Sequence, residues 1–264
     1  MTRRAFALLT DFGLDTPYVG QLKATLFSHA PSVPVLDITH AVPPCSIMAG
    51  ALFLFSSRPH FPAGTIFICV IDPEVGSSRK ILCLAGRNHI VLGPDNGLLS
   101  LAHHDMLTEG EVKTYCLDEQ ALQGSPTFQG RDVIAPAAAK LANGMSPKTL
   151  GPAFRAVHTA PLWAQPEMTP LYYTCTVLHV DRFGNCILNV PLTATFPNCP
   201  VAVTVPHTGH SHGVISATHY QQLPKSVPGI IPGSQRFYEL ACNKASAAEH
   251  LCLKPGDICR IEFS

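Results

Sequence analysis

The chain has 264 residues, of which 46% are hydrophobic and 14% are charged, and its 18 basic and 18 acidic residues give no formal net charge. This length is sufficient for one large domain or two smaller ones with an extensive core, and the composition excludes a disordered chain. The balanced charge gives no indication of a surface for nucleic acid or an anionic membrane, so we expect neither partner.

The first half of the chain alternates segments typical of strands and of helices. Apolar runs predict strands at 5–13, 32–39, 64–72, 80–86 and 89–94. Helices are predicted, from the spacing of apolar residues, at 18–30, 46–57 and 132–144. Because the strands are apolar on both faces, these elements predict an N-terminal α/β domain with a mixed, mostly parallel sheet covered on both sides.

The second half begins with recurrent prolines and no periodicity, which predicts a linker at 151–170. Short runs of β-forming residues follow at 171–181, 186–190, 200–205, 212–218, 236–242 and 257–263. They predict a C-terminal all-β domain of the sandwich or barrel type. The expected organisation is therefore an α/β domain at 1–150, the linker at 151–170 and a β domain at 171–264.

The ten cysteines are scattered, form no C-x-x-C pair and lie mostly in apolar runs. This pattern favours reduced core residues in a cytoplasmic protein. The apolar run after the N-terminal arginines is too short for a signal peptide, and no run reaches the roughly 18 residues of a membrane-spanning helix.

Polar residues occur where the predicted strands end: Asp11, Asp37, His40, Asp72, Asp95 and Asn96. Arg79 follows Asp72 by seven residues, and the segment FQGRD, with Gln129, opens the last predicted helix of the first domain. Because the carboxyl ends of parallel strands meet at one edge of a sheet, this edge is a candidate binding site. Each residue alone would also suit a turn or a helix cap.

In the second domain the segment VDRFGNCILN places Asp181, Phe183 and Asn185 on one tight turn. An aromatic ring and an amide so placed could hold a planar heterocycle, although Gly-Asn is also typical of an ordinary hairpin turn.

Histidines are close together in HTGHSHG, which contains His207, His210 and His212, and in LAHHD, which contains His103 and His104. Three nearby imidazoles could bind a metal, but no acid or cysteine accompanies them, so we expect a polar loop and no metal site.

Seven segments of the chain resemble, in the same order, the S-adenosyl-L-methionine (SAM) hydrolases, which are SAM hydroxide adenosyltransferases related to fluorinase and chlorinase. They are LLTDFG…YVGQLKATL, VLDITHAVPP, VIDPEVGSSR, GPDNGLLS, TFQGRDVIAPAAAKLANG, VDRFGNCILNV and GSQRFYELACN. The resemblance implies attack of water or hydroxide on the ribose C5′ of SAM, with SAM as substrate and no cofactor. It also implies a homotrimer whose active site lies between the N-terminal domain of one subunit and the C-terminal domain of the next.

The resemblance also assigns roles to individual residues. In the N-terminal domain it implies that Asp11 binds the ribose hydroxyls and that Phe128 packs near the ribose. Asp72 and Arg79 match two of the three residues, Asp, Arg and His, that surround the attacking water. Asp72 would orient the guanidinium, whose charge favours hydroxide over water.

In the C-terminal domain the resemblance implies further contacts. Asp181 would bind the amino group of methionine, and Phe183 and Asn185 would hold adenine. Ser234 would hold the methionine carboxylate, and Glu239, in the same motif, is a further candidate for binding.

The chain departs from the family pattern at three positions. Gln129 replaces the histidine of FHGRD, Glu74 stands where DPGVG has glycine, and Thr16 replaces an aspartate, with Asp15 one position earlier. A glutamine can bind water but cannot take its proton near pH 7. Three functions follow as hypotheses: a SAM hydrolase in which Gln129 positions water, a SAM- or adenosine-binding protein with little turnover, and a SAM-dependent halogenase. The third is disfavoured because a carboxylate at position 72 would repel a halide.

Overall fold

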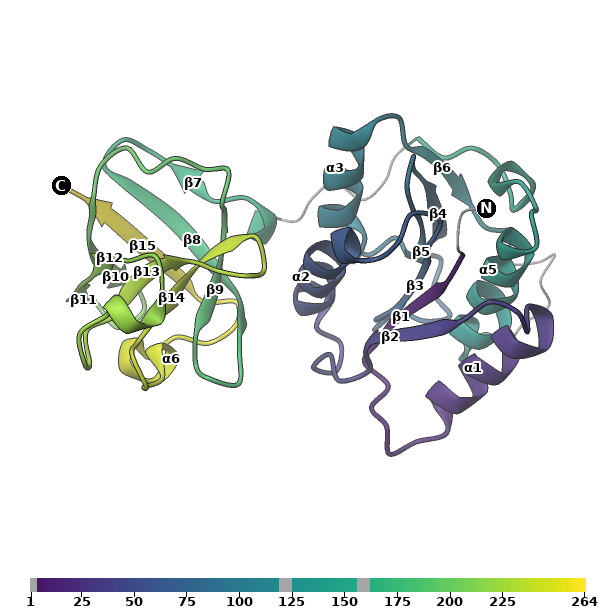
Figure 1. Cartoon of the computed structure of the whole chain (residues 1–264), viewed down its shortest axis with the longest axis horizontal. Helices are drawn as coiled ribbons and strands as arrows, with labels where there is room; N and C mark the ends of the chain where they lie inside the picture. The colour runs from purple at the N-terminus through teal and green to yellow at the C-terminus, as the bar shows by residue number, and fades with distance from the viewer. Residues whose placement is uncertain (1–3, 119–124, 156–161) are drawn as a thin grey trace. The chain divides into compact units, whose positions relative to one another are not determined.

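A computed structural model describes residues 4–118, 125–155 and 162–264 of the chain. The chain divides into two compact units, Met1–Thr159 and Ala160–Ser264 (Figure 1). The predicted linker at 151–170 includes residues 156–161, which lie outside the described part, so its role as a linker stays a prediction.

The first unit contains a six-stranded sheet with the strand order β2-β1-β3-β5-β4-β6. Its strands are β1 (Phe6–Thr10), β2 (Val35–Thr39), β3 (Ile66–Val70), β4 (Ile81–Ala85), β5 (Ile90–Pro94) and β6 (Lys113–Cys116). The pairs β1–β2, β1–β3 and β3–β5 are parallel, whereas β4 runs antiparallel to both β5 and β6. The prediction of a mixed, mostly parallel sheet is confirmed.

Helices cover both faces of this sheet. They are α1 (Tyr18–His29), α2 (Ile47–Ser57), α3 (Ser100–Glu109) and α5 (Ala135–Ala142). Figure 1 shows α2 and α3 on one face and α1 and α5 on the other. The alternation of strand side chains supplies both cores, because Phe6 and Leu8 pack on the α1 and α5 side while Ala7 and Leu9 pack on the α2 side.

Short helical turns complete this unit: η1 (Arg58–His60), η2 (Gly130–Ile134) and η3 (Pro147–Thr149). The helix α3 and the strand β6 were not among the predicted elements. The sequence of α3 is largely polar, so its pattern does not indicate a buried face. Asp105 nevertheless lies on that face and pairs with the guanidinium of Arg58. The predicted helix at 132–144 begins as a π-helical turn, η2, before α5.

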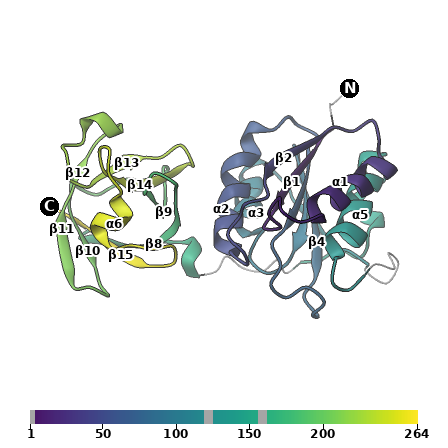
Figure 2. The ribbon, with the colours of Figure 1, turned by 90° about the horizontal axis from the view of Figure 1, so that it is seen from below.

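The second unit is mainly antiparallel (Figure 2). Its strand order is β11-β10-β15-β8-β9-β14-β13-β12, and β7 pairs with β8. Its elements are η4 (Leu162–Ala164), β7 (Glu167–Met168), β8 (Tyr172–Val180), β9 (Cys186–Pro191), β10 (Pro200–Val205), β11 (His210–Gly213), β12 (Ile215–Ser216), η5 (Tyr220–Gln222), β13 (Gly229–Pro232), β14 (Phe237–Ala241), α6 (Ala247–Leu251) and β15 (Ile258–Phe263). The expected β-rich second unit is confirmed. The single strand predicted at 212–218 is instead two, because the chain leaves β10 at Val214 and pairs with β13.

None of the ten cysteines forms a disulfide bond, and six of them are buried. Burial raises the pKa of the Cys83 thiol to about 12, which keeps this side chain protonated and unreactive. Within the described part of the chain, no helix has both the length and the apolar character needed to span a bilayer.

Candidate active site

Three side chains that are distant in sequence form one hydrogen-bonded group at the carboxyl end of β3. Asp72 lies two residues beyond β3, Arg79 lies just before β4, and Gln129 precedes η2. The Arg79 Nε donates to Asp72 Oδ2 at 2.8 Å, and its Nη2 donates both to this oxygen and to Gln129 Oε1. The three predicted catalytic residues are therefore brought together.

This group is almost removed from solvent within the first unit, with 7% of the Asp72 side chain and 5% of the Arg79 side chain exposed. Two of its atoms, Asp72 Oδ1 and Arg79 Nη1, are buried and have no hydrogen-bond partner among the described residues. A buried acceptor and a buried donor are costly to leave unpaired, so they are suited to hold a small polar molecule such as water.

The turn η2 brings Gln129 to the end of β3. A Cβ atom on Gly130 would lie 3.2 Å from both methyl carbons of Val70, which is the last residue of β3. The absence of a side chain at 130 thus allows the close approach of this turn to the strand. The position of Gln129 depends on that approach.

Asp11 and Phe128 lie at the carboxyl end of β1 and at the entrance to η2. Asp11 Oδ2 accepts a hydrogen bond of 2.8 Å from the backbone N–H of Cys45, so it joins the loops after β1 and β2. The ring of Phe128 meets those of Phe12 and Tyr18 edge to face, with centroid distances of 5.6 and 5.4 Å. The structure therefore places a carboxylate and an aromatic cluster on the loops of one sheet edge.

Two other polar residues of this edge have structural partners. His40 Nδ1 lies 2.8 Å from Thr10 Oγ1, and its Nε2 lies 3.1 Å from Asp37 Oδ1. Burial alone would raise the pKa of Asp37, but the hydrogen bonds from Lys23 and His40 outweigh it and lower that pKa. These contacts fasten α1 to the end of β2.

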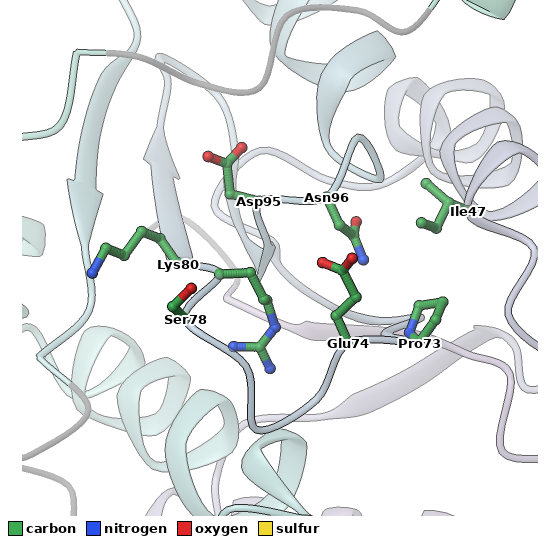
Figure 3. Close-up of a pocket in the computed structure, with 8 residues that line it drawn as sticks. Ile47, Pro73, Glu74, Ser78, Lys80, Asp95 and Asn96 are labelled. Atoms are coloured by element: carbon green, nitrogen blue, oxygen red, sulfur yellow. The ribbon is translucent and has the colours of Figure 1, made fainter.

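A cavity of about 420 Å³ borders Arg79 within the first unit. Its lining residues are Ile47, Pro73, Glu74, Ser78, Arg79, Lys80, Asp95 and Asn96. Figure 3 shows Pro73 and Glu74 on the loop after β3, and Asp95 and Asn96 on the loop after β5. Asn96 has a structural role, because its amide donates to Ile71 O at 3.0 Å and its oxygen accepts from Leu98 N.

In the second unit Asp181 and Asn185 stabilise the turn between β8 and β9. Asp181 Oδ1 accepts from the backbone N–H groups of Phe183 and Asn185, and its Oδ2 accepts from the Asn185 amide at 2.9 Å. Phe183 is 75% exposed at the tip of this turn, whereas Asn185 is buried. The turn thus presents an aromatic ring to its surroundings.

Glu239 is 3% exposed on β14 and accepts a hydrogen bond from the phenol of Tyr220. Burial raises the pKa of Glu239, and the negative charge of Asp181 raises it further, against the opposing effect of the Tyr220 bond. Ser234 is exposed in the hairpin turn between β13 and β14. A Cβ on Gly233, the preceding residue, would lie 2.7 Å from Glu239 Oε2.

Two aromatic residues beside these groups were not predicted as site residues. Tyr18 contacts Phe128 and Tyr220 binds Glu239, and both tyrosines are almost half exposed. Tyr18 begins YVGQLKATL, one of the segments that carry the family resemblance, but the resemblance assigned no role to it, and Tyr220 lies in a loop outside those segments.

The histidines of the second unit lie near one another without forming a metal centre. The ring centroids of His210 and His212 are 6.2 Å apart, and those of His212 and His250 are 5.5 Å apart. In the part of the chain that is described, no group of three or more His, Cys, Asp or Glu side chains is arranged to hold a metal ion.

The fold and these residues define a class of protein: a doubly covered α/β unit with a buried carboxylate–guanidinium–amide group at its strand ends, followed by a β unit. Within this class, the chain belongs to the SAM hydroxide adenosyltransferase family. The N-terminal domain of that family matches residues 6–151, and its C-terminal domain matches residues 175–260. The family resemblance drawn from the seven sequence segments is confirmed.

The chain is similar over nearly its whole length to two curated hydrolases. An (R)-S-adenosyl-L-methionine hydrolase of Thermus thermophilus is 37% identical over 267 residues, which cover 96% of this chain and 97% of that protein. A protein of the same name from Salinispora arenicola is 34% identical, with 96% and 95% covered. A fluorinase of Nocardia brasiliensis is 27% identical over 56% of this chain and 57% of its own length.

Two solved structures share the fold. A conserved protein from Thermotoga maritima superposes with a TM-score of 0.85 at 28% identity, covering 97% of this chain and 99% of the other. A conserved protein from Thermus thermophilus has a TM-score of 0.75 at 34% identity, covering 98% and 99%.

Proposed function

We propose that this protein hydrolyses SAM to adenosine and L-methionine. The observation that carries the proposal is the buried group of Asp72, Arg79 and Gln129, with one acceptor and one donor atom left to bind water. Relatives of nearly the same length that are named SAM hydrolases support it.

In the proposed reaction the oxygen of a bound water attacks C5′ of the ribose. The C5′–S bond breaks, its electron pair returns to sulfur, methionine leaves as a neutral thioether, and one proton is released. Because the leaving group needs no protonation, the site has to orient water and hold C5′ in line with it. Arg79 Nη1 and Asp72 Oδ1 are the groups that would bind this water, and Asp11 and Phe128 would hold the ribose.

Residues of the second unit would bind the two ends of the substrate. We assign Phe183 and Asn185 to adenine, Asp181 to the methionine amino group and Ser234 to its carboxylate. Glu239 acts less directly, since its carboxylate is buried and bonded to Tyr220.

The test is incubation of the purified protein with SAM in water enriched in ¹⁸O. Adenosine and methionine should accumulate together, with ¹⁸O in the 5′-hydroxyl of adenosine, because the water oxygen becomes bonded to C5′. Separate incubations with the two sulfonium epimers of SAM would establish which one is the substrate. If neither product forms after hours while SAM stays bound, the result would instead support the alternative of a SAM-binding protein with little turnover. Gln129 favours that alternative because an amide cannot take a proton from water.

The halogenase hypothesis has a separate test. Incubation with SAM and chloride or fluoride should give no 5′-halo-5′-deoxyadenosine, because the negative charge of Asp72 lies where a halide would have to bind.

We further propose a cytoplasmic homotrimer whose active sites are shared between neighbouring subunits. The low proportion of charged residues, 14%, and the 75% exposure of Phe183 support burial of part of the surface by another subunit. Its reduced cysteines suit the cytoplasm.

A further inference from the structure

The proposed hydrolysis releases a proton, yet the group at the end of β3 offers no good acceptor for it. Gln129 is an amide, which takes no proton near neutral pH, and its Oε1 already accepts from Arg79. Asp72 Oδ1 is left to accept a hydrogen bond from the water, but Asp72 Oδ2 accepts two hydrogen bonds from the Arg79 guanidinium, so a proton kept on Asp72 would cost a buried ion pair. Another group near Arg79 is therefore better suited to take the proton.

The residues that line the cavity beside Arg79 include two further acidic residues, Glu74 and Asp95, and one lysine, Lys80. Glu74 lies on the same loop as Asp72, two residues further along, and is exposed within the first unit. Asp95 is placed differently. Its backbone N–H donates to Lys80 O at 2.8 Å, and its charge acts on His103 of α3.

We propose that Glu74 is a further catalytic residue, which accepts through water in this cavity the proton released by the attacking water. The cavity, about 420 Å³ in volume, is large enough for several water molecules, and both Glu74 and Arg79 line it. This inference depends on the proposed hydrolase function.

The step balances without any additional reactant. The water oxygen forms its bond to C5′ as the C5′–S bond breaks, and the electron pair of that bond remains on sulfur. The proton from water is relayed to the Glu74 carboxylate, which becomes a neutral acid and then loses the proton to solvent. Arg79 keeps its charge throughout, so it continues to stabilise the developing hydroxide.

The experiment compares Glu74→Gln with the matched control Glu111→Gln, which removes the same charge from an exposed carboxylate of the same unit that does not line this cavity. We expect Glu74→Gln to lower kcat by at least about tenfold, within the usual contribution of a general base, and Glu111→Gln to leave it within about twofold. Circular dichroism and calorimetric binding of SAM would confirm that both variants fold and bind.

A second variant separates proton acceptance from other effects of charge. Gln129→His supplies an imidazole in the same group, so adding it to Glu74→Gln should raise the rate at least to that of the wild type and introduce a new dependence near pH 6.5. The inference is overturned if Glu74→Gln is as active as the wild type, or if both carboxylate variants lose activity equally. If the wild type itself binds SAM without forming adenosine, the proposed function fails together with this inference, which is a distinct outcome.

Discussion

At the scale of single residues, the proposed binding of the attacking water depends on how the Arg79 guanidinium is held. Arg79 uses two of its nitrogens to bind Asp72 and Gln129 and leaves Nη1 buried without a partner among the described residues. The planar shape of the guanidinium makes this division possible, because its donors point in fixed, different directions. Lysine could not replace it, since an ammonium group has no such fork.

Gln129→His should raise kcat for SAM hydrolysis by about 10²-fold, the lower end of the range for general bases, because the imidazole can accept the proton directly. The rate should increase with pH as the imidazole loses its own proton, between about pH 6 and 7. Steady-state rates from pH 5 to 9 would measure both effects. Gln129→Asn, which retains an amide, is the control and should show no such dependence.

Glu239→Gln should change the pH dependence of stability. Because the pKa of Glu239 is raised in the folded protein, its favourable contribution is present below its unfolded pKa and is lost as pH rises through the folded pKa. The variant can still accept the Tyr220 hydrogen bond, so its stability should improve relative to the wild type from about pH 4 upward. Urea unfolding at several pH values would test this, and a constant difference across pH would contradict it.

At the scale of elements, the loops at the carboxyl ends of β1, β2 and β3 converge, and each is fixed by backbone or side-chain bonds. Asp11 joins two of these loops through Cys45, and His40 joins the ends of β1 and β2 through Thr10. A different group lies before the amino ends of β3 and β5. There Arg58 is fully buried and pairs with Asp105 and Glu109, while His89 Nδ1 lies 3.0 Å from its Nη1.

Arg58→Leu should lower the free energy of unfolding by about 3–5 kcal/mol, because it leaves the buried carboxylate of Asp105 without its cation. Lys113→Ala is the matched control. It removes a cation that lies 3.7 Å from Glu111 with both side chains mostly exposed, and it should change stability by less than about 1 kcal/mol. Chemical denaturation would measure both variants, and equal effects would show that the buried network contributes no more than a surface pair.

At the scale of the whole molecule, the candidate residues are divided between two units with separate hydrophobic cores. Asp72, Arg79 and Gln129 belong to the first unit, whereas Phe183 and Asn185 belong to the second. A homotrimer with shared sites would join them from neighbouring subunits.

Co-expression of Arg79→Ala and Asn185→Ala chains tests this arrangement. Each variant alone should be nearly inactive, but mixed trimers should recover up to about a quarter of the wild-type activity, because some sites receive both intact units. Sedimentation should give a mass three times the 28.3 kDa of one chain. If the mixed trimers recover no activity, the residues of each active site come from one subunit and not from two.

The sequence by itself determined the alternation of strands and helices, the β-rich second unit and the family, because periodicity and ordered motifs are local properties of the chain. It also identified Asp72, Arg79 and Gln129 as candidates, through their positions after strands and through the resemblance. Only the tertiary structure decided that these three side chains share hydrogen bonds and that Glu239 is buried behind Tyr220. It also showed that Glu74 lines a cavity with Arg79. Such contacts join residues up to 50 positions apart, and they depend on strand order and loop approach, which no local pattern encodes.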